Sequence, residues 1–357
     1  MKIGITSIST APLRHGIIFF ILALLFVGFP ALAEAQTGGF AGSYTRMGFG
    51  PRGMASGNAM SAAAENGIYS HYNPALSAQV DNTQIDFSSA LMSFDRTLHG
   101  LNVTFPLPPH AGLSVGLLNA NVSDIDGRTS SGYDTGDLST HEYQLFVSFG
   151  INLGRRARIG TSVKFLLADF HDDISSSTGT GFDIGLIVEP IDHLKAAIVA
   201  QDLIAGYTWN TDDLYSSQDS RNRSDEFPNR FKFNLTYEPS SDWFVSAEYE
   251  IQRIESEYFD RSVTGDAPAR SRRNVDNIVT DEHQFRMGGG FRVHDRLTMR
   301  SGIEILNLDD VDQTFKPSAG FSLHLPFDQY EPTIDYAWVR EPTGISHMHV
   351  LALQLNL

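Results

Sequence analysis

Charged side chains keep to one parity along much of this chain, and that pattern limits the folds open to it. In six segments of roughly ten residues between positions 140 and 306, charged residues stand at even positions and most large apolar residues at odd positions. Only Asp169 and Arg253 break the rule, and each ends its segment. Successive side chains of a β-strand point to opposite faces, so these segments are expected to be strands with one wet face and one apolar face.

Similar segments recur from residue 82 to the end of the chain, separated by turn residues. The fourteen predicted strands cover 82–93, 97–106, 111–122, 140–153, 157–169, 180–189, 194–203, 229–238, 242–253, 282–293, 296–306, 314–325, 331–339 and 346–357. Short connections alternate with longer ones, as in outer-membrane barrels, where a basic residue facing lipid at the midplane costs about 2–4 kcal/mol. The sequence therefore predicts an all-β fold, a 14-stranded antiparallel transmembrane β-barrel over residues 81–357. A secreted sandwich or solenoid is the alternative.

The first 35 residues have the layout of a cleaved export signal. Lys2 and Arg14 precede an apolar run at 16–27, and 33–35 offers the small residues that a signal peptidase selects. That run is too short for a comfortable membrane-spanning helix. We therefore expect residues 1–35 to be a signal peptide that is removed on export to a bacterial outer membrane.

Composition excludes several classes of function. The chain has no cysteine, which rules out disulfides, thiolate metal sites and a cysteine nucleophile. Its formal net charge of −16 disfavours nucleic acid as a partner. We expect no catalytic residues, because a hydrolase needs a nucleophile, a base and an orienting group together, and we identify no nucleophile elbow such as Gly-x-Ser-x-Gly. No cofactor is indicated, and the oligomeric state stays open.

Residues 46–76 interrupt the strand pattern and are rich in small residues. Glycine at this density allows backbone to approach backbone closely. The segment closes on Asn73, Pro74 and Ala75, where proline fixes its own φ and pushes the preceding residue out of the helical region. We expect residues 36–80 to form a hatch, or plug, inside the barrel, with a short helix ended by a rigid turn. An ordinary N-terminal helix lying on a soluble sheet is the alternative.

Counting residues outward from the predicted turns places charged side chains of neighbouring strands opposite one another inside the barrel. A turn centred near residue 240 sets Lys232 opposite Glu248, and one near residue 295 sets Arg286 opposite Glu304, with Arg300 close by. We expect these pairs to stiffen the barrel or to line water, and selection of a substrate is the less favoured alternative.

The hatch supplies two further cations, Arg46 and Arg52, which are expected to dock on Glu250 or Asp335 of the wall. Four apolar residues share the parity of the charged residues in their own strands and are the candidates for a ligand-facing patch: Phe146, Leu166, Ile187 and Phe244. The same side chains are equally suited to packing against the plug.

Metal binding is expected to be absent. His347 and His349 lie two apart on one strand face, which supplies two ligands of a site that needs more. Two acidic groups offer hard oxygens for calcium: Asp124 with Asp126, and Asp309 with Asp310 and Asp312. Neither group has the ligand spacing of an EF-hand loop, so solvated acidic loops are the favoured interpretation.

Several motifs resemble the FadL/TodX superfamily of outer-membrane proteins, including its PorV-like branch. The stretch from Arg46 to Ala59, followed by Tyr72-Asn73-Pro74-Ala75, resembles the N-terminal hatch motif of that superfamily. Residues 181–185 (Gly-Phe-Asp-Ile-Gly) and 201–203 (Gln-Asp-Leu) resemble PorV-like strand motifs. The resemblance implies a barrel of fourteen strands with the hatch inside it.

Two functions of different classes follow from this resemblance. FadL-like members pass hydrophobic small molecules through a pocket gated by the hatch and out sideways through the barrel wall. If this chain does the same, we expect movement of the hatch around Asn73 and Pro74 to open the path. PorV-like members bind exported protein cargo at the outer membrane and hand it on. The expected partners are therefore outer-membrane lipid and either a hydrophobic small molecule or secreted protein cargo.

Overall fold

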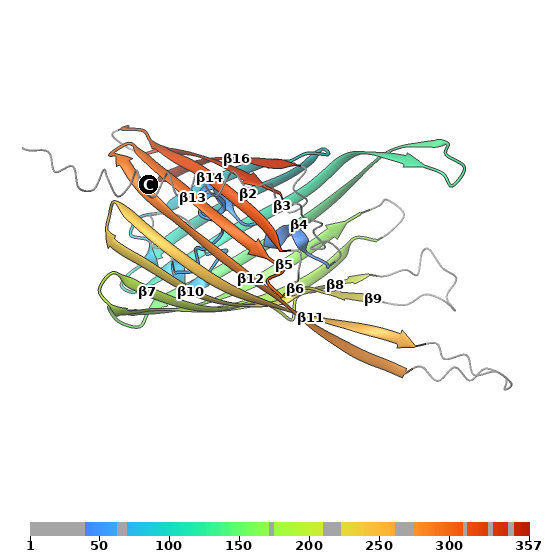
Figure 1. The fold of residues 1–357 in the computed structure, drawn as a ribbon, viewed down its shortest axis with the longest axis horizontal. Helices are drawn as coiled ribbons and strands as arrows, with labels where there is room; N and C mark the ends of the chain where they lie inside the picture. Colours follow the sequence, from blue (N-terminus) through green and yellow to red (C-terminus); the bar gives the residue numbers. More distant parts are fainter. Residues whose placement is uncertain are drawn as a thin grey trace, which may run out of the picture.

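The computed structural model describes residues 40–62, 70–170, 175–209, 223–260, 274–309, 313–327, 331–341 and 346–357 (Figure 1). The predicted signal peptide, residues 1–35, lies outside these ranges, as do Asp310 and Asp312 of the acidic loop. None of the helices in the described ranges has the length and apolar character needed to cross a bilayer.

Within the described ranges, fourteen strands form one closed antiparallel barrel. They are β1 (Gln84–Leu91), β2 (Arg96–Leu107), β3 (Ala111–Arg128), β4 (Asp134–Asn152), β5 (Ala157–Asp169), β6 (Ser177–Ile191), β7 (Leu194–Leu203), β10 (Asn229–Ser240), β11 (Trp243–Asp260), β12 (Asn274–His294), β13 (Leu297–Leu306), β14 (Thr314–His324), β15 (Thr333–Arg340) and β16 (His347–Asn356). Each strand pairs with its neighbours in chain order, β7 with β10 included, and β1 pairs with β16 to close the ring. The predicted fold is confirmed.

The wall separates polar from apolar side chains as the parity predicts. In β5, Lys164 and Leu166 are buried inside the barrel, whereas Val163 and Phe165 are 41% and 51% exposed on its outer face. Water is absent from the bilayer core, so a strand can cross it only with its apolar face outward and its hydrogen bonds paired in a closed ring.

Two pairs of strands continue well beyond their neighbours. The β3–β4 and β11–β12 pairs extend to Arg128 and Asp134, and to Asp260 and Asn274, and they project as ribbons from one end of the barrel (Figure 1). The sequence analysis treated 123–139 and 256–281 largely as loops, which is wrong for 123–128, 134–139, 256–260 and 274–281. Outside lipid both faces of a ribbon meet water, so the hydrogen-bonded ladder continues without the alternation that marks a membrane strand.

A short extra hairpin occupies what the sequence predicts to be a loop between β7 and β10. Its strands are β8 (Gly206–Trp209) and β9 (Arg223–Glu226). The hairpin is joined to the wall by one pairing, Thr178 of β6 with Thr208 of β8. It therefore lies at the end of the barrel that carries the ribbons, beside β6 (Figure 1).

The chain before β1 lies inside the barrel and is called here the lumen segment, residues 40–62 and 70–80. It contains η1 (Ser43–Arg46), α2 (Gly50–Ala55) and η2 (Pro74–Gln79). The α2 helix contacts strands β13 to β16 and β1, and η2 contacts β2 to β6, as the blue ribbon within the barrel shows (Figure 1). Pro74 opens a helix here, whereas the sequence pattern predicts that it ends one.

Candidate functional site

Wall glycines mark the places where the lumen segment docks. A Cβ atom added to Gly302 would lie 2.2 Å from the backbone nitrogen of Gly57, and one added to Gly160 would lie 2.3 Å from that of Ala75. Real Cβ atoms do not approach backbone so closely, so only glycine lets the segment reach the wall here. These contacts hold the segment against β12–β14 and against β3–β6, which lie on opposite sides of the ring.

Hydrogen bonds cross-link the lumen segment internally. The Tyr72 hydroxyl donates to Oδ1 of Asn58 at 2.7 Å and accepts from the backbone N–H of Phe49 at 2.8 Å. The Asn58 amide in turn donates to Oε1 of Glu304 on β13 at 2.8 Å. Three parts of the segment that are distant in sequence are thereby tied to one another and to the wall.

Asn73 is a buried junction of the lumen segment. Its Oδ1 accepts from the backbone N–H of Ala75 at 2.9 Å, which caps η2, and its Nδ2 donates to the carbonyl of Ser61 at 2.7 Å. A Cβ atom on Gly185 would lie 1.9 Å from Asn73 Oδ1. The Asn73-Pro74-Ala75 turn is therefore fixed against the wall on β5 and β6.

Four charged side chains form a buried cluster across β5, β6, β7 and β10. Nζ of Lys164 lies 2.7 Å from the carboxylate of Asp183 and 2.6 Å from that of Asp202. Arg230 lies 2.6 Å from the second carboxylate oxygen of Asp202. The sequence analysis did not single out these four residues as a site.

Arg286 is the centre of a second buried cluster on β10 to β14. It lies 3.3 Å from Glu248 and 3.2 Å from Glu304, and it also contacts Glu250. Lys232 lies 3.6 Å from Glu250, and Lys316 lies 2.9 Å from Glu304. Every carboxylate of this cluster has a cationic neighbour.

The two clusters together are called the charge belt. Its members among the described side chains are Lys164, Asp183, Asp202, Arg230, Lys232, Glu248, Glu250, Arg286, Glu304 and Lys316. Cations and anions are equal in number, and all are buried. Burying an ion pair brings little net stability, but removing one partner strands the other in a low-dielectric site.

The register corrects one predicted pair. Lys232 lies opposite Glu250, not Glu248, because the β10–β11 pairing is centred at residue 241 and not at 240. Arg286 lies opposite Glu304 on β13, and also opposite Glu248 on β11. A shift of one residue in the centre of a hairpin moves each partner by two positions, which keeps the face but changes which charges meet.

The arginines of the lumen segment lie in different surroundings. Nε of Arg52 donates to Oδ2 of Asp335 on β15 at 2.9 Å, which ties α2 to the wall. Arg46 instead donates to the carbonyl oxygens of Ala41 at 3.0 Å and Phe40 at 3.4 Å within its own segment. Arg300 donates to the hydroxyl of Ser322 on β14.

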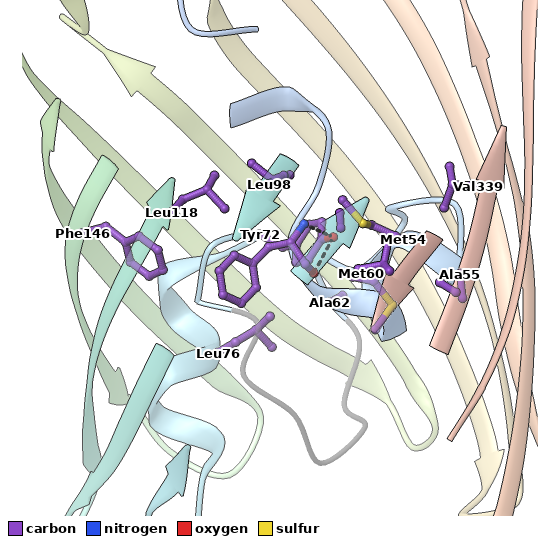
Figure 2. Packing of buried hydrophobic residues seen from close by; sticks show 14 of the residues in the cluster. Met54, Ala55, Met60, Ala62, Tyr72, Leu76, Leu98, Leu118, Phe146 and Val339 are labelled. Atoms are coloured by element: carbon purple, nitrogen blue, oxygen red, sulfur yellow. Dashed lines mark hydrogen bonds between the residues drawn. The ribbon is translucent and has the colours of Figure 1, made fainter. Parts of the chain in front are cut away.

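The four apolar candidates are divided between two buried clusters and do not form one patch. Phe146, Ile187 and Phe244 belong to the larger cluster, which the lumen segment fills. The ring of Phe146 lies 6.2 Å from that of Phe49 and 6.0 Å from that of His71, centroid to centroid. Figure 2 shows Tyr72 of the lumen segment between Phe146, Leu118 and Leu98 of the wall on one side and Met54 and Met60 of its own segment on the other.

Leu166 belongs to the smaller cluster, beside the β8–β9 hairpin. Its partners there include Ala205, Tyr207 and Phe227, and Ala41 of the lumen segment packs against them. The Tyr207 hydroxyl donates to the Glu142 carboxylate at 3.0 Å. This cluster therefore joins the start of the lumen segment to the wall.

A groove of about 970 Å³ lies in the wall at this cluster and is called the wall groove. Phe165 and Phe231, which are exposed on the outer face, line it together with Leu166 and Phe227, which are buried. The β6–β7 ladder ends at the pair Phe182–Leu203. Beyond that pair, β6 is paired instead with β8, through Thr178 and Thr208.

The candidates for metal binding or catalysis have other contacts. His347 and His349 lie against the rings of Trp338 and Tyr336, and no group of three or more His, Asp or Glu side chains within the described ranges is arranged to hold a metal. The spacing Gly-x-Ser-x-Gly of a nucleophile elbow does occur once, from Gly112 to Gly116, which the sequence analysis overlooked. It lies within β3, whereas an elbow needs a strand-to-helix turn, and the hydroxyl of its serine donates to Asn102.

No family model matches the sequence, and no curated protein matches it. Solved structures do match. The toluene transporter TbuX of Ralstonia pickettii is 15% identical, with a TM-score of 0.56 over 87% of this chain and 98% of that chain. The CymD monoaromatic hydrocarbon channel is 12% identical, with a TM-score of 0.58 over 87% of this chain and 97% of that one. A FadL homologue of Pseudomonas aeruginosa is 12% identical, with a TM-score of 0.56 over 86% and 97%. The predicted resemblance is confirmed for the fold, since the chain folds like the FadL/TodX outer-membrane barrels, whereas none of these structures tests the resemblance to the PorV-like branch.

Proposed function

We propose that this protein passes hydrophobic small molecules across a bacterial outer membrane, to which it is exported by cleavage of residues 1–35. The observation that carries the proposal is the wall groove, because side chains of the lumen face and of the lipid face line the same cavity. Its volume of about 970 Å³ is at the upper end of the ~300–1,000 Å³ usual for small-molecule sites.

The lining of the wall groove favours apolar molecules without charge. Phenylalanine, leucine, isoleucine and alanine side chains dominate it, with threonine and serine hydroxyl groups between them. Glu226 is the one side chain of formal charge among the described lining residues. The structural neighbours include proteins named as toluene transporters and monoaromatic hydrocarbon channels, which is consistent with this chemistry.

The start of the lumen segment acts in this proposal as the gate. A Cβ atom on Gly42 would lie 2.2 Å from the ring of Phe227, so the backbone near Gly42 is pressed against the floor of the wall groove. The sequence-based expectation puts the moving turn at Asn73 and Pro74. The bonds of Asn73 favour a different division, in which that turn is the fixed end and residues 40–46 move away from Phe227.

A bulky side chain in the wall groove should slow passage. We expect Thr180→Trp to lower the initial rate of toluene uptake several-fold, because Thr180 lines the groove from the outer face and the indole would fill it. The rate is measured in bacterial cells that lack another channel for toluene. Ile198→Trp is the matched control, since Ile198 is 54% exposed on the outer face of β7, away from the groove.

Equal rates of toluene uptake in Thr180→Trp and Ile198→Trp would show that toluene does not pass through the wall groove. Uptake no faster than in cells without the protein would contradict the conduit altogether. In that case a secreted protein that co-purifies in stoichiometric amount from the native membrane would support the alternative, PorV-like role in protein secretion.

A further inference from the structure

The turn between β7 and β8, residues 202–205, forms one side of the wall groove and is called the β7–β8 turn. Three of its residues, Leu203, Ile204 and Ala205, line the groove. The backbone N–H of Ala205 donates to the carbonyl oxygen of Asp202 at 3.2 Å, which closes the turn. Ile204 is 86% exposed, whereas Ala205 is buried. The turn therefore reaches from the surface of the barrel to its buried interior.

The backbone of the β7–β8 turn is strained. Asp202 has a φ of 57° and Ile204 has a φ of 55°, in the left-handed region that favours glycine. Aspartate tolerates this region, but a β-branched residue such as isoleucine rarely enters it, because its Cβ atom is crowded by the backbone. Such a conformation persists only where the surrounding structure holds it. The shape of the turn therefore depends on the contacts that hold it.

Hydrogen-bonded ladders hold the β7–β8 turn at few points. The β7–β10 ladder ends at the pair Gln201–Arg230. The β6–β7 ladder reaches the turn through one pair, Phe182–Leu203, beyond its change of register. On the other side of the turn, β8 is joined to β6 by a single pair. Side-chain contacts must therefore supply much of the constraint on this turn.

Asp202 supplies such a constraint from inside the barrel. Its carboxylate lies 2.6 Å from Nζ of Lys164 and 2.6 Å from the guanidinium of Arg230. Its own backbone N–H donates to Oδ1 of Asp183 at 2.8 Å. All four residues are buried. Hydrogen bonds that involve a charged group are stronger than neutral ones, so both the side chain and the backbone of Asp202 are fixed to the wall.

We propose that Asp202 is a positioning residue, which fixes the β7–β8 turn and thereby limits the size of the molecules that the wall groove admits. Asp202 is not among the residues that line the groove, so it acts through the turn and not by contact with the molecule that passes. A rigid turn excludes molecules wider than the groove, whereas a mobile turn yields to them. This inference rests on the proposed function of the wall groove and adds the group that sets its selectivity.

The motion of the β7–β8 turn can be measured directly, because the chain has no cysteine. Ile204→Cys gives the purified full-length protein one attachment site for a nitroxide spin label, at an exposed position. We expect electron paramagnetic resonance in detergent micelles to show faster motion of the label when Asp202→Asn is added. Asparagine keeps the shape of the side chain and tolerates the same φ, but it loses the ion pairs with Lys164 and Arg230. Unchanged motion would overturn the proposal.

Selectivity is measured as the ratio of the initial uptake rates of phenanthrene and toluene, in bacterial cells that lack another channel for either. We expect the unaltered protein to favour toluene, and Asp202→Asn to raise the phenanthrene-to-toluene ratio several-fold. The ratio does not depend on how much protein reaches the membrane, so a merely structural loss would not move it. Asp202→Asn leaves the buried Arg230 without its carboxylate. Should that variant fail to assemble, Asp202→Asn combined with Arg230→Gln removes both charges, and the same rise is expected.

Glu304→Gln is the matched control. Glu304 is likewise buried between two cations, Arg286 at 3.2 Å and Lys316 at 2.9 Å, but it lies on β13 and does not line the wall groove. Label motion and uptake ratio should match those of the unaltered protein, and an equal rise in Glu304→Gln would overturn the proposal, because loss of any buried charge would then suffice.

The uptake experiment also separates this inference from the function on which it rests. Toluene uptake with an unchanged ratio in Asp202→Asn would overturn the inference and leave the proposed function intact. Equal uptake of phenanthrene and toluene by the unaltered protein would do the same. Uptake of neither hydrocarbon by the unaltered protein would contradict the proposed function, and the size limit with it.

Discussion

Replacing Arg286 by methionine is expected to lower the free energy of unfolding by about 3–5 kcal/mol, the usual cost of breaking a buried ion pair. The guanidinium lies within 3.3 Å of Glu248 and Glu304 and also contacts Glu250, and all of these side chains are buried. Methionine would fill much of the volume but leave three carboxylates in mutual repulsion. Equilibrium unfolding in urea, with the protein in detergent micelles and followed by tryptophan fluorescence, measures the change.

Arg253→Met is the control for this prediction. Arg253 makes two hydrogen bonds of 2.9 Å to the two carboxylate oxygens of Asp281, yet its side chain is 49% exposed. Exposed pairs contribute little, so we expect no measurable change. Adding Glu250→Gln to Arg286→Met should recover part of the stability, because one stranded charge is removed. A similar loss in the two single variants would show that burial does not set the importance of the charge belt.

The wall could be predicted from the sequence because lipid imposes a local rule on every strand. Side chains such as Phe165 and Lys164 alternate between lipid and lumen, and a charge on the wrong face is costly enough to keep the pattern clean. The rule ends where lipid ends. The ribbons and the β8–β9 hairpin follow no such alternation, which is why their strands were expected to be loops.

Contacts inside the barrel could be predicted only in part. Arg286 meets Glu304 because the β12–β13 pairing is centred at residue 295, as counted, whereas the β10–β11 pairing is centred at 241 instead of 240, so Lys232 meets Glu250. Both ladders also have a register shift next to the turn, and no local residue pattern fixes the centre of a hairpin to a single residue.

Asp183 and Asp202 were missed for a different reason. Asp183 stands at an odd position between Phe182 and Ile184, whose side chains are far less buried, so its own strand indicates that it faces inward. Asp202 lies within a change of register in the β6–β7 ladder, between Ala200 and Leu203, and has a φ of 57°. Their partners Lys164 and Arg230 come from other strands, and only the closed ring brings the four together.

Replacing Gly160 by valine is expected to release η2 from the wall. The new Cβ atom would lie 2.3 Å from the backbone nitrogen of Ala75 and 2.4 Å from the carbonyl carbon of Pro74. Backbone cannot turn aside as a flexible side chain can, so the lumen segment itself must shift, at a cost of about 1–3 kcal/mol or more for overpacking. We expect proteases to cleave within residues 70–80 of the variant, and ion conductance across a planar bilayer to rise.

Thr161→Val separates docking of the lumen segment from the strand itself. The substitution places the same side chain one position along β5, where it faces away from the lumen segment, so protease resistance and conductance should match those of the unaltered protein. If Gly160→Val resisted protease as well as the unaltered protein does and conducted no more ions, the glycine contacts would not be what holds the lumen segment. If both variants lost resistance, valine would be disturbing β5 itself. Cleavage in Gly160→Val alone would assign the Asn73-Pro74-Ala75 end to the fixed part of the gate, and would leave residues 40–46 as the part that moves.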